Sequence, residues 1–163
     1  MAVPDSARQA YIGLGSNLGA PRQTLLQALN DLEHAAGVEL IEVSSLYRSA
    51  PVQATGPDFI NAVAEVRTTL APLELLDCLL AIETAHHRQR PYRNAPRTLD
   101  LDLLWHDGLV VDEPRLTLPH PRMHERAFVL APLLELAPSW RLPQGELADL
   151  LAACSGQPIE RLL

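Results

Sequence analysis

The stretch Leu99-Asp100-Leu101-Asp102-Leu103-Leu104-Trp105 alternates leucine with aspartate. This period of two is typical of a β-strand, whose successive side chains leave opposite faces. We therefore expect the leucines to enter the core and Asp100 and Asp102 to share the other face. Neighbouring carboxylates repel each other, and a hard divalent ion such as Mg²⁺ relieves the repulsion while needing only one or two protein carboxylates. The alternative to a metal site is that the two aspartates lie on a solvated face of the strand.

The elements before this strand complete a recognisable order. They are predicted as strand, helix, strand, strand and helix at residues 10–14, 21–37, 38–48, 59–69 and 72–87. With the acidic strand the order becomes βαββαβ, the split βαβ pattern of a ferredoxin-like fold. We expect an α+β domain over residues 1–163, with helices packed on a mainly antiparallel sheet.

Further elements are predicted as C-terminal additions to this core. Asp107-Gly108 is a strong signal for a tight hairpin that leads from the acidic strand into residues 109–111. Two more helices are expected near residues 126–136 and 144–153.

Composition excludes several classes of protein. The formal net charge of −7 argues against a broad nucleic-acid-binding face, and no apolar run is long enough for a membrane span. The N-terminus has no signal-peptide pattern, so we expect a cytoplasmic protein, and we expect it to be a monomer. All 13 basic residues are arginine. Mechanisms that need a phosphate-binding or Schiff-base lysine are therefore excluded.

Four arginines, at positions 88, 90, 93 and 97, gather just before the acidic strand. In an acidic chain, this concentration of positive charge beside two carboxylates indicates a site for a polyphosphate held together with a metal ion. Guanidinium groups suit bidentate contacts with phosphate oxygens. The alternative is a charged surface loop.

Two other motifs are candidates for chemistry. The stretch Gly13–Gly19 fits neither a dinucleotide fingerprint nor a lysine-containing phosphate loop, and we interpret it as a tight turn before the first helix. His120 lies between Pro119 and Pro121, which suits a side chain held in a fixed place. Covalent catalysis is not predicted, since no pairing of a nucleophile with a histidine stands out.

Four segments together resemble the 6-hydroxymethyl-7,8-dihydropterin pyrophosphokinase family of folate biosynthesis. The most specific is the segment 96–104, Pro-Arg-Thr-Leu-Asp-Leu-Asp-Leu-Leu; the others are 44–48, 58–62 and 118–123. The resemblance extends from Ala10 to about Pro138. It implies a transferase that moves a pyrophosphoryl group from ATP to the hydroxymethyl group of the pterin and releases AMP.

The resemblance also implies roles for individual residues. Asp100 and Asp102 match the ligands of two Mg²⁺ ions, and Asp100, Arg88 and Arg97 match catalytic positions. Matches to nucleotide-binding positions are Glu83, Arg90, Arg93, Arg97, Arg115, Thr117, His120 and Arg126. Matches to pterin-binding positions are Ser49, Pro51, Val52, Phe59, Asn61 and Phe128. The two phenylalanines are the whole phenylalanine content of the chain, and a flat heteroaromatic ring needs stacking faces.

The chain departs from the family pattern in the arginine-rich segment, where Asn94 and Ala95 replace a tryptophan found in some members and a customary glycine. Two other functions stay open. One is a relative that binds pterin or nucleotide without catalysis. The other is a metal-dependent phosphohydrolase that uses Asp100, Asp102 and His120.

Overall fold

The computed structural model describes residues 7–51, 56–87 and 99–162. The strands are β1 (Arg8–Ser16), β2 (Val38–Val43), β3 (Tyr47–Ser49), β4 (Phe59–Thr68), β5 (Asp100–His106), β6 (Val111–Glu113), β7 (Leu116–Leu118), β8 (Arg141–Leu142), β9 (Gly145–Glu146) and β10 (Ile159–Arg161). The helices are α1 (Pro21–His34), α2 (Pro72–His87), α3 (Ala127–Leu136) and α4 (Leu147–Ala152), with a 3-10 turn at Met123–Glu125.

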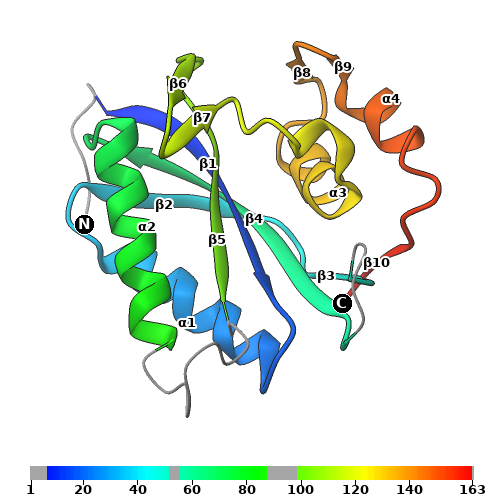
Figure 1. Cartoon of the computed structure of the whole chain (residues 1–163), viewed down its shortest axis with the longest axis horizontal. Coiled ribbons are helices and arrows are strands. Elements are labelled where there is room, and N and C mark those ends of the chain that lie inside the picture. The colour runs from blue at the N-terminus through cyan, green and yellow to red at the C-terminus, as the bar shows by residue number, and fades with distance from the viewer. Residues whose placement is uncertain (1–6, 52–55, 88–98, 163) are drawn as a thin grey trace.

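The main sheet has the strand order β10-β3-β4-β1-β5, and β2 also pairs with β4. Every pairing in it is antiparallel. Counting β2 and β3 together as the second strand, the order is 4-1-3-2, with β10 added beyond β3. The predicted ferredoxin-like α+β fold is therefore confirmed. Figure 1 shows β1 in the middle of the sheet, between β4 and β5.

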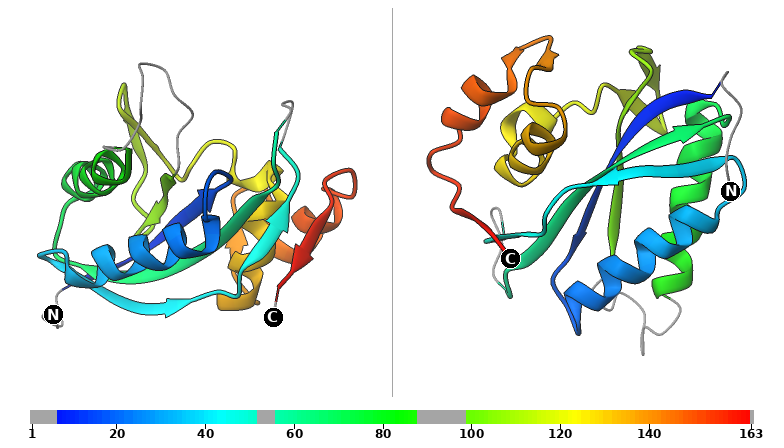
Figure 2. Two further views of the ribbon diagram at one scale, coloured as in Figure 1. Left: turned by 90° about the horizontal axis from the view of Figure 1, so that it is seen from below. Right: turned by 180° about the vertical axis from the view of Figure 1, so that it is seen from behind.

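The two helices of the βαββαβ core cover one face of this sheet (Figures 1 and 2). Leu99, Leu101 and Leu103 join the core beneath them at 1%, 5% and 3% exposure, as the leucine alternation predicted. A second core lies on the opposite face, where Leu104 packs with residues of α3 and α4. Asp100 and Asp102 are thus on the side of the sheet that carries the C-terminal elements.

Local sequence explains how the first helix begins and ends. Pro21 occupies the first turn of α1, where its missing N–H costs nothing. Gly37 follows the helix with φ +79°, a conformation that other residues rarely adopt. A Cβ added there would lie 3.0 Å from side-chain atoms of Thr69 and Leu70, so this tight connection needs a glycine.

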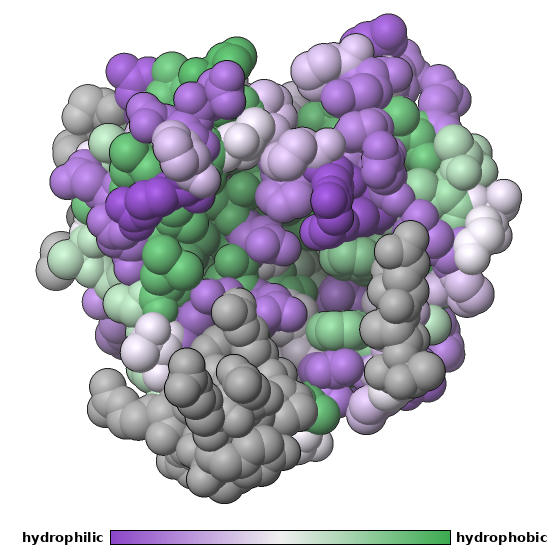
Figure 3. All heavy atoms as spheres, in the orientation of Figure 1, coloured by the Kyte–Doolittle hydropathy of each residue, from purple (hydrophilic) through white to green (hydrophobic). Residues whose placement is uncertain are grey.

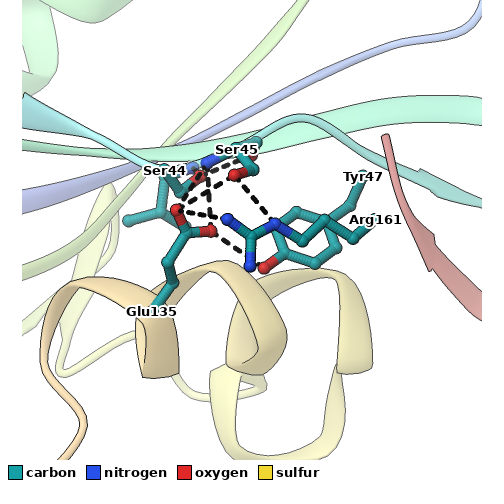
Figure 4. Close-up of polar contacts among 6 residues, drawn as sticks. Ser44, Ser45, Tyr47, Glu135 and Arg161 are labelled. Atoms are coloured by element: carbon teal, nitrogen blue, oxygen red, sulfur yellow. Dashed lines mark hydrogen bonds and ion pairs between the residues drawn. The ribbon is translucent and has the colours of Figure 1, made fainter. Parts of the chain in front are cut away.

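The predicted strand 38–48 is interrupted in the structure, because Ser44 and Ser45 leave the regular ladder. The Ser44 hydroxyl accepts a hydrogen bond from Val63 N–H at 2.9 Å. Ser45 instead donates its N–H and its hydroxyl to the Glu135 carboxylate, each at 3.0 Å. Figure 4 shows Glu135 reaching from α3 to this interruption, where Tyr47 also donates to it.

The hairpin predicted at Asp107-Gly108 is wrong in its strand pairing. The turn itself forms, with φ of 51° and 70° at the two residues. However, β6 pairs with β7 and not with β5. The backbone N–H of His120 donates to the carbonyl of Leu104 at 2.8 Å, so a later segment takes the place beside β5 that a hairpin partner would fill.

Candidate active site

A cavity of about 1080 Å³ opens on the face of the sheet that carries the aspartates. Strands β1, β3, β4 and β5 contribute to it, together with α2 on one side and α3 on the other. The face seen in Figure 3 is hollowed near its centre, where apolar and polar residues meet. Eight of the predicted site residues line this one cavity: Ser49, Phe59, Asn61, Glu83, Asp100, Asp102, Arg126 and Phe128.

The floor of the cavity is set by strand register. In the pairing of β1 with β5, Gly15 lies opposite Asp100 and Gly13 opposite Asp102. On its other side Gly15 lies opposite Asn61 of β4. The interpretation of Gly13–Gly19 as a tight turn is therefore wrong for its first residues, which belong to β1 and line the cavity. Because Gly13 and Gly15 carry no side chains, the backbone of β1 itself forms this part of the cavity floor beside the aspartates.

Glu83 of α2 holds the backbone between the two aspartates. Its carboxylate accepts a hydrogen bond from the N–H of Leu101 at 2.7 Å. β5 is an edge strand of the sheet, and an edge N–H needs an acceptor outside the ladder. Glu83 is buried at 8% exposure and also lines the cavity. It therefore helps to fix the positions from which Asp100 and Asp102 project.

Asn61 and Ser49 form a polar pair on neighbouring strands. The Asn61 amide donates to the Ser49 hydroxyl at 2.7 Å, and both side chains are buried. This bond fixes the orientation of the amide and directs its carbonyl oxygen toward β1, where a Cβ on Gly15 would lie 3.2 Å from it. A buried, oriented amide can recognise a ligand that offers a matching hydrogen-bonding edge.

The two phenylalanines of the cavity lining come from different elements. Phe59 begins β4 and Phe128 lies in the first turn of α3. The guanidinium carbon of Arg126 lies 5.5 Å from the centre of the Phe128 ring, within the range of a cation–π contact. The site therefore combines two aromatic faces with a positively charged group.

His120 is not part of the cavity lining, but it is hydrogen-bonded to Arg122, which is. Its Nδ1 accepts a hydrogen bond from the Arg122 N–H at 3.2 Å, which leaves Nε2 as the protonated nitrogen of the neutral ring. Burial lowers the pKa of His120, and the charges of Arg126 and Arg122 lower it further, while Asp102 acts in the opposite direction. A lowered pKa favours the neutral form of this ring, which lies near one of the two aspartates.

Other predicted residues fall elsewhere. Among the described ones, Pro51, Arg115 and Thr117 are not part of the cavity lining. Arg115 forms an ion pair with Asp77 of α2. The predictions for Val52, Arg88, Arg90, Arg93 and Arg97 lie outside the described residues.

Several lining residues were not predicted from the sequence, namely Gly13, Gly15, Leu76, Arg122, Glu125 and Gln157. The two glycines carried a signal, since glycines two apart in a strand share a face and allow a ligand to approach the backbone. The sequence around Gln157 carried no such signal, because only the path of the folded C-terminal segment brings this residue to the cavity.

Asp100 and Asp102 offer two carboxylates from β5, whereas the nearby Glu83 carboxylate already accepts the hydrogen bond of the Leu101 N–H. Within the described ranges, no group of three or more His, Cys, Asp and Glu side chains is arranged to hold a metal ion. A site with two carboxylates is too poor in ligands for structural zinc but sufficient for Mg²⁺ that also binds phosphate oxygens.

Comparison with known proteins identifies the family. The model of the 7,8-dihydro-6-hydroxymethylpterin-pyrophosphokinase family matches residues 11–138. The chain belongs to this family. It is 50% identical over 157 residues to a 2-amino-4-hydroxy-6-hydroxymethyldihydropteridine pyrophosphokinase of Pseudomonas aeruginosa, covering 95% of this chain and 97% of that one. A relative of the same name from Haemophilus influenzae is 43% identical, with coverage of 85% and 87%.

Solved structures agree on the fold. A wild-type Plasmodium falciparum HPPK-DHPS with pterin and p-hydroxybenzoate superposes with a TM-score of 0.73 at 14% identity. The match covers 93% of this chain and 44% of that one, so the chain spans less than half of this larger relative. A second HPPK-DHPS, in complex with substrates, gives a TM-score of 0.72 at 12% identity, with coverage of 90% and 43%.

Membership of the family confirms the predicted enzyme class. The chain is a pyrophosphokinase of the folate pathway, a transferase that uses ATP as co-substrate and a hydroxymethyldihydropterin as acceptor. Within the part of the chain that the structure describes, no helix has the length and apolar character needed to cross a membrane.

Proposed function

We propose that the cavity holds ATP and 6-hydroxymethyl-7,8-dihydropterin side by side and that pyrophosphoryl transfer takes place above Asp100 and Asp102. The observation that supports this most directly is the composition of the cavity. Its lining combines the two aspartates with an oriented Asn61–Ser49 pair and with Phe59 and Phe128. The first group suits a metal-bound polyphosphate, and the second suits a flat ring with a hydrogen-bonding edge.

The acidic strand fits the two Mg²⁺ ions that the family resemblance implies. Asp100 and Asp102 supply hard oxygen donors from one face of β5, and phosphate oxygens and water would complete each coordination shell. When bound, the metal would neutralise the negative charge of the transferred group. Glu83 would keep the carboxylates in place through its bond to the backbone of Leu101.

The pterin would occupy the side of the cavity formed by β3, β4 and the start of α3. Phe59 and Phe128 would stack on the two faces of its ring. Asn61 would read the amide edge of the ring, and Ser49, Pro51 and Val52 would contribute neighbouring contacts. Water is a competing acceptor, so a ring held in this fixed position favours transfer to its hydroxymethyl group.

The nucleotide would lie toward α2 and the 3-10 turn. Arg126 and Arg122 line this side and would balance phosphate charge, and the neutral His120 could donate from Nε2. The remaining predicted contacts are Glu83, Arg90, Arg93, Arg97, Arg115 and Thr117. For Arg115 to reach the nucleotide, its ion pair with Asp77 would have to open.

Release of AMP fixes the bond that breaks. The hydroxyl oxygen of the pterin attacks the β-phosphorus of ATP, and the bond from this phosphorus to the oxygen that bridges it to the α-phosphate is cleaved. The hydroxyl proton must leave, and Asp100 is the residue we would place nearest to it. Arg88 and Arg97 would stabilise charge on the group in transfer. Such a reaction depends on positioning and charge neutralisation more than on covalent help.

The test is a coupled assay of AMP release from ATP, run with and without the pterin. We expect AMP only when the pterin is present, together with formation of the pterin diphosphate. Phosphate or pyrophosphate released without pterin would favour the phosphohydrolase. Binding of both ligands by calorimetry without any product would favour the non-catalytic relative.

A further inference from the structure

Among the described residues, Gln157 is the one lining residue of the cavity that follows α4 in the chain, and it lies well beyond residue 138, where the family match ends. Its amide side chain makes two hydrogen bonds to the backbone. Nε2 donates to the carbonyl of Glu125 at 2.8 Å, and Oε1 accepts from the N–H of Ala127 at 3.0 Å. The two contacts therefore lie on either side of Arg126.

The start of α3 depends on this side chain for a cap. Arg126 is the N-cap residue of α3, and its own side chain makes no capping hydrogen bond. The first N–H groups of a helix have no partner inside the helix and need an acceptor from elsewhere. Gln157 supplies that acceptor to Ala127, the first residue of α3. A cap from a distant part of the chain thus fixes the segment that carries Arg126 and Phe128.

The segment that carries Gln157 is itself held firmly. β10 pairs with β3, with Ile159 opposite Ser49 and Arg161 opposite Tyr47. The Nε of Arg161 donates to the Ser45 hydroxyl at 3.0 Å, and its guanidinium lies 3.7 Å from the Glu135 carboxylate. Figure 4 shows Arg161 meeting Glu135 at this point.

We propose that Gln157 is a positioning residue for the substrate site, acting through the start of α3. This rests on the function proposed above, because it assumes that Arg126 and Phe128 contact the substrates. The C-terminal segment then connects the two sides of the pterin site: β10 pairs with the strand that carries Ser49, and Gln157 fixes the turn that carries Phe128. Gln157 need not touch the reacting atoms to perform this role.

The test compares Gln157→Met with a matched control, Gln9→Met. Methionine keeps the length of glutamine and removes its hydrogen bonds. Gln9 also makes two side-chain hydrogen bonds, to Glu65 at 2.9 Å and to Tyr11 at 3.2 Å, and it is not part of the cavity lining. Each variant is assayed for kcat and for the KM of the pterin and of ATP.

We expect Gln157→Met to raise the KM for the pterin about five- to tenfold, because the start of α3 would no longer hold Phe128 in its binding position, while kcat changes less than about twofold. This split follows because the start of α3 would bind substrate and would not act on the group in transfer. Gln9→Met should leave both constants within about twofold of the wild type. An unchanged KM in Gln157→Met, or an equal rise in Gln9→Met, would overturn the proposal.

Arg161→Gln provides a second variant if Gln157→Met does not fold. Removing the guanidinium loosens the other end of the same segment, and we expect the KM for the pterin to rise about two- to fivefold. No rise in this variant would also contradict the proposal. Failure of the proposed function would look different, because wild-type enzyme would then release no pterin-dependent AMP.

Discussion

Gly13 and Gly15 show how the site depends on residues without side chains. They face Asp102 and Asp100 across β1 and β5, and Gly15 faces Asn61 on its other side. The aspartates could be predicted because the period of a strand is local and visible in seven residues. The position of the two glycines opposite these aspartates could not be predicted, because it follows from the register between strands far apart in the chain.

A substitution of Gly15 by alanine tests this arrangement at the scale of a single residue. The added Cβ would lie 3.2 Å from Asn61 Oδ1, closer than ordinary contact, so Asn61 must shift. Because Asn61 is also bonded to Ser49, we expect the KM for the pterin to rise about tenfold. The dissociation constant of ATP, measured by calorimetry, should stay nearly unchanged. Equal losses for both ligands would contradict a role confined to the pterin.

At the scale of elements, helix α3 determines where the strand predicted at residues 38–48 is interrupted. The sequence 38–48 alternates well enough to predict one strand, and nothing near Ser44 signals an interruption. The interruption arises because Glu135, far away in the sequence, accepts hydrogen bonds from Ser45 and Tyr47. The same limit explains the hairpin at Asp107-Gly108, whose turn was predictable but whose pairing was decided by the later segment at His120.

The hydrogen bonds of Glu135 lead us to expect that the stability of the fold depends on pH. Burial opposes its charge, but hydrogen bonds from Ser45 and Tyr47 outweigh burial and lower the pKa of Glu135. A carboxyl with a lowered pKa contributes stability above its ordinary pKa of about 4.3, and this contribution is lost as the pH falls through the lowered value. We expect Glu135→Gln to lose about 1–2 kcal/mol of unfolding free energy at pH 7.

The measurement is urea unfolding of wild type and variant at several pH values. The difference between them should shrink as the pH falls below the ordinary carboxyl pKa of about 4.3, because the wild-type carboxylate then becomes progressively protonated. Glu146→Gln is the control, since Glu146 is exposed and its ion pair with Arg141 is long, at 3.7 Å. A difference that does not depend on pH would show that the charge of Glu135 does not matter.

At the scale of the whole molecule, the alternation of leucine with aspartate assigns the two faces of the sheet. The leucines join the core beneath α1 and α2, and the aspartates face the cavity. The βαββαβ order was predictable because each helix and strand has its own hydrophobic periodicity and its own signals for where it begins and ends. The contribution of the C-terminal segment to the cavity was not predictable, because it arises only when β10 pairs with β3 and brings Gln157 to the cavity.

The most direct test of the account is the turnover of Asp102→Asn, which keeps the size of the side chain and removes its charge. Asp112→Asn, at an exposed aspartate of β6, is the matched control. We expect pterin-dependent AMP release to fall about 100-fold or more in Asp102→Asn, with an unchanged thermal midpoint, and to stay at the wild-type level in Asp112→Asn. Near-normal turnover of Asp102→Asn would contradict the claim that the acidic strand is the centre of pyrophosphoryl transfer.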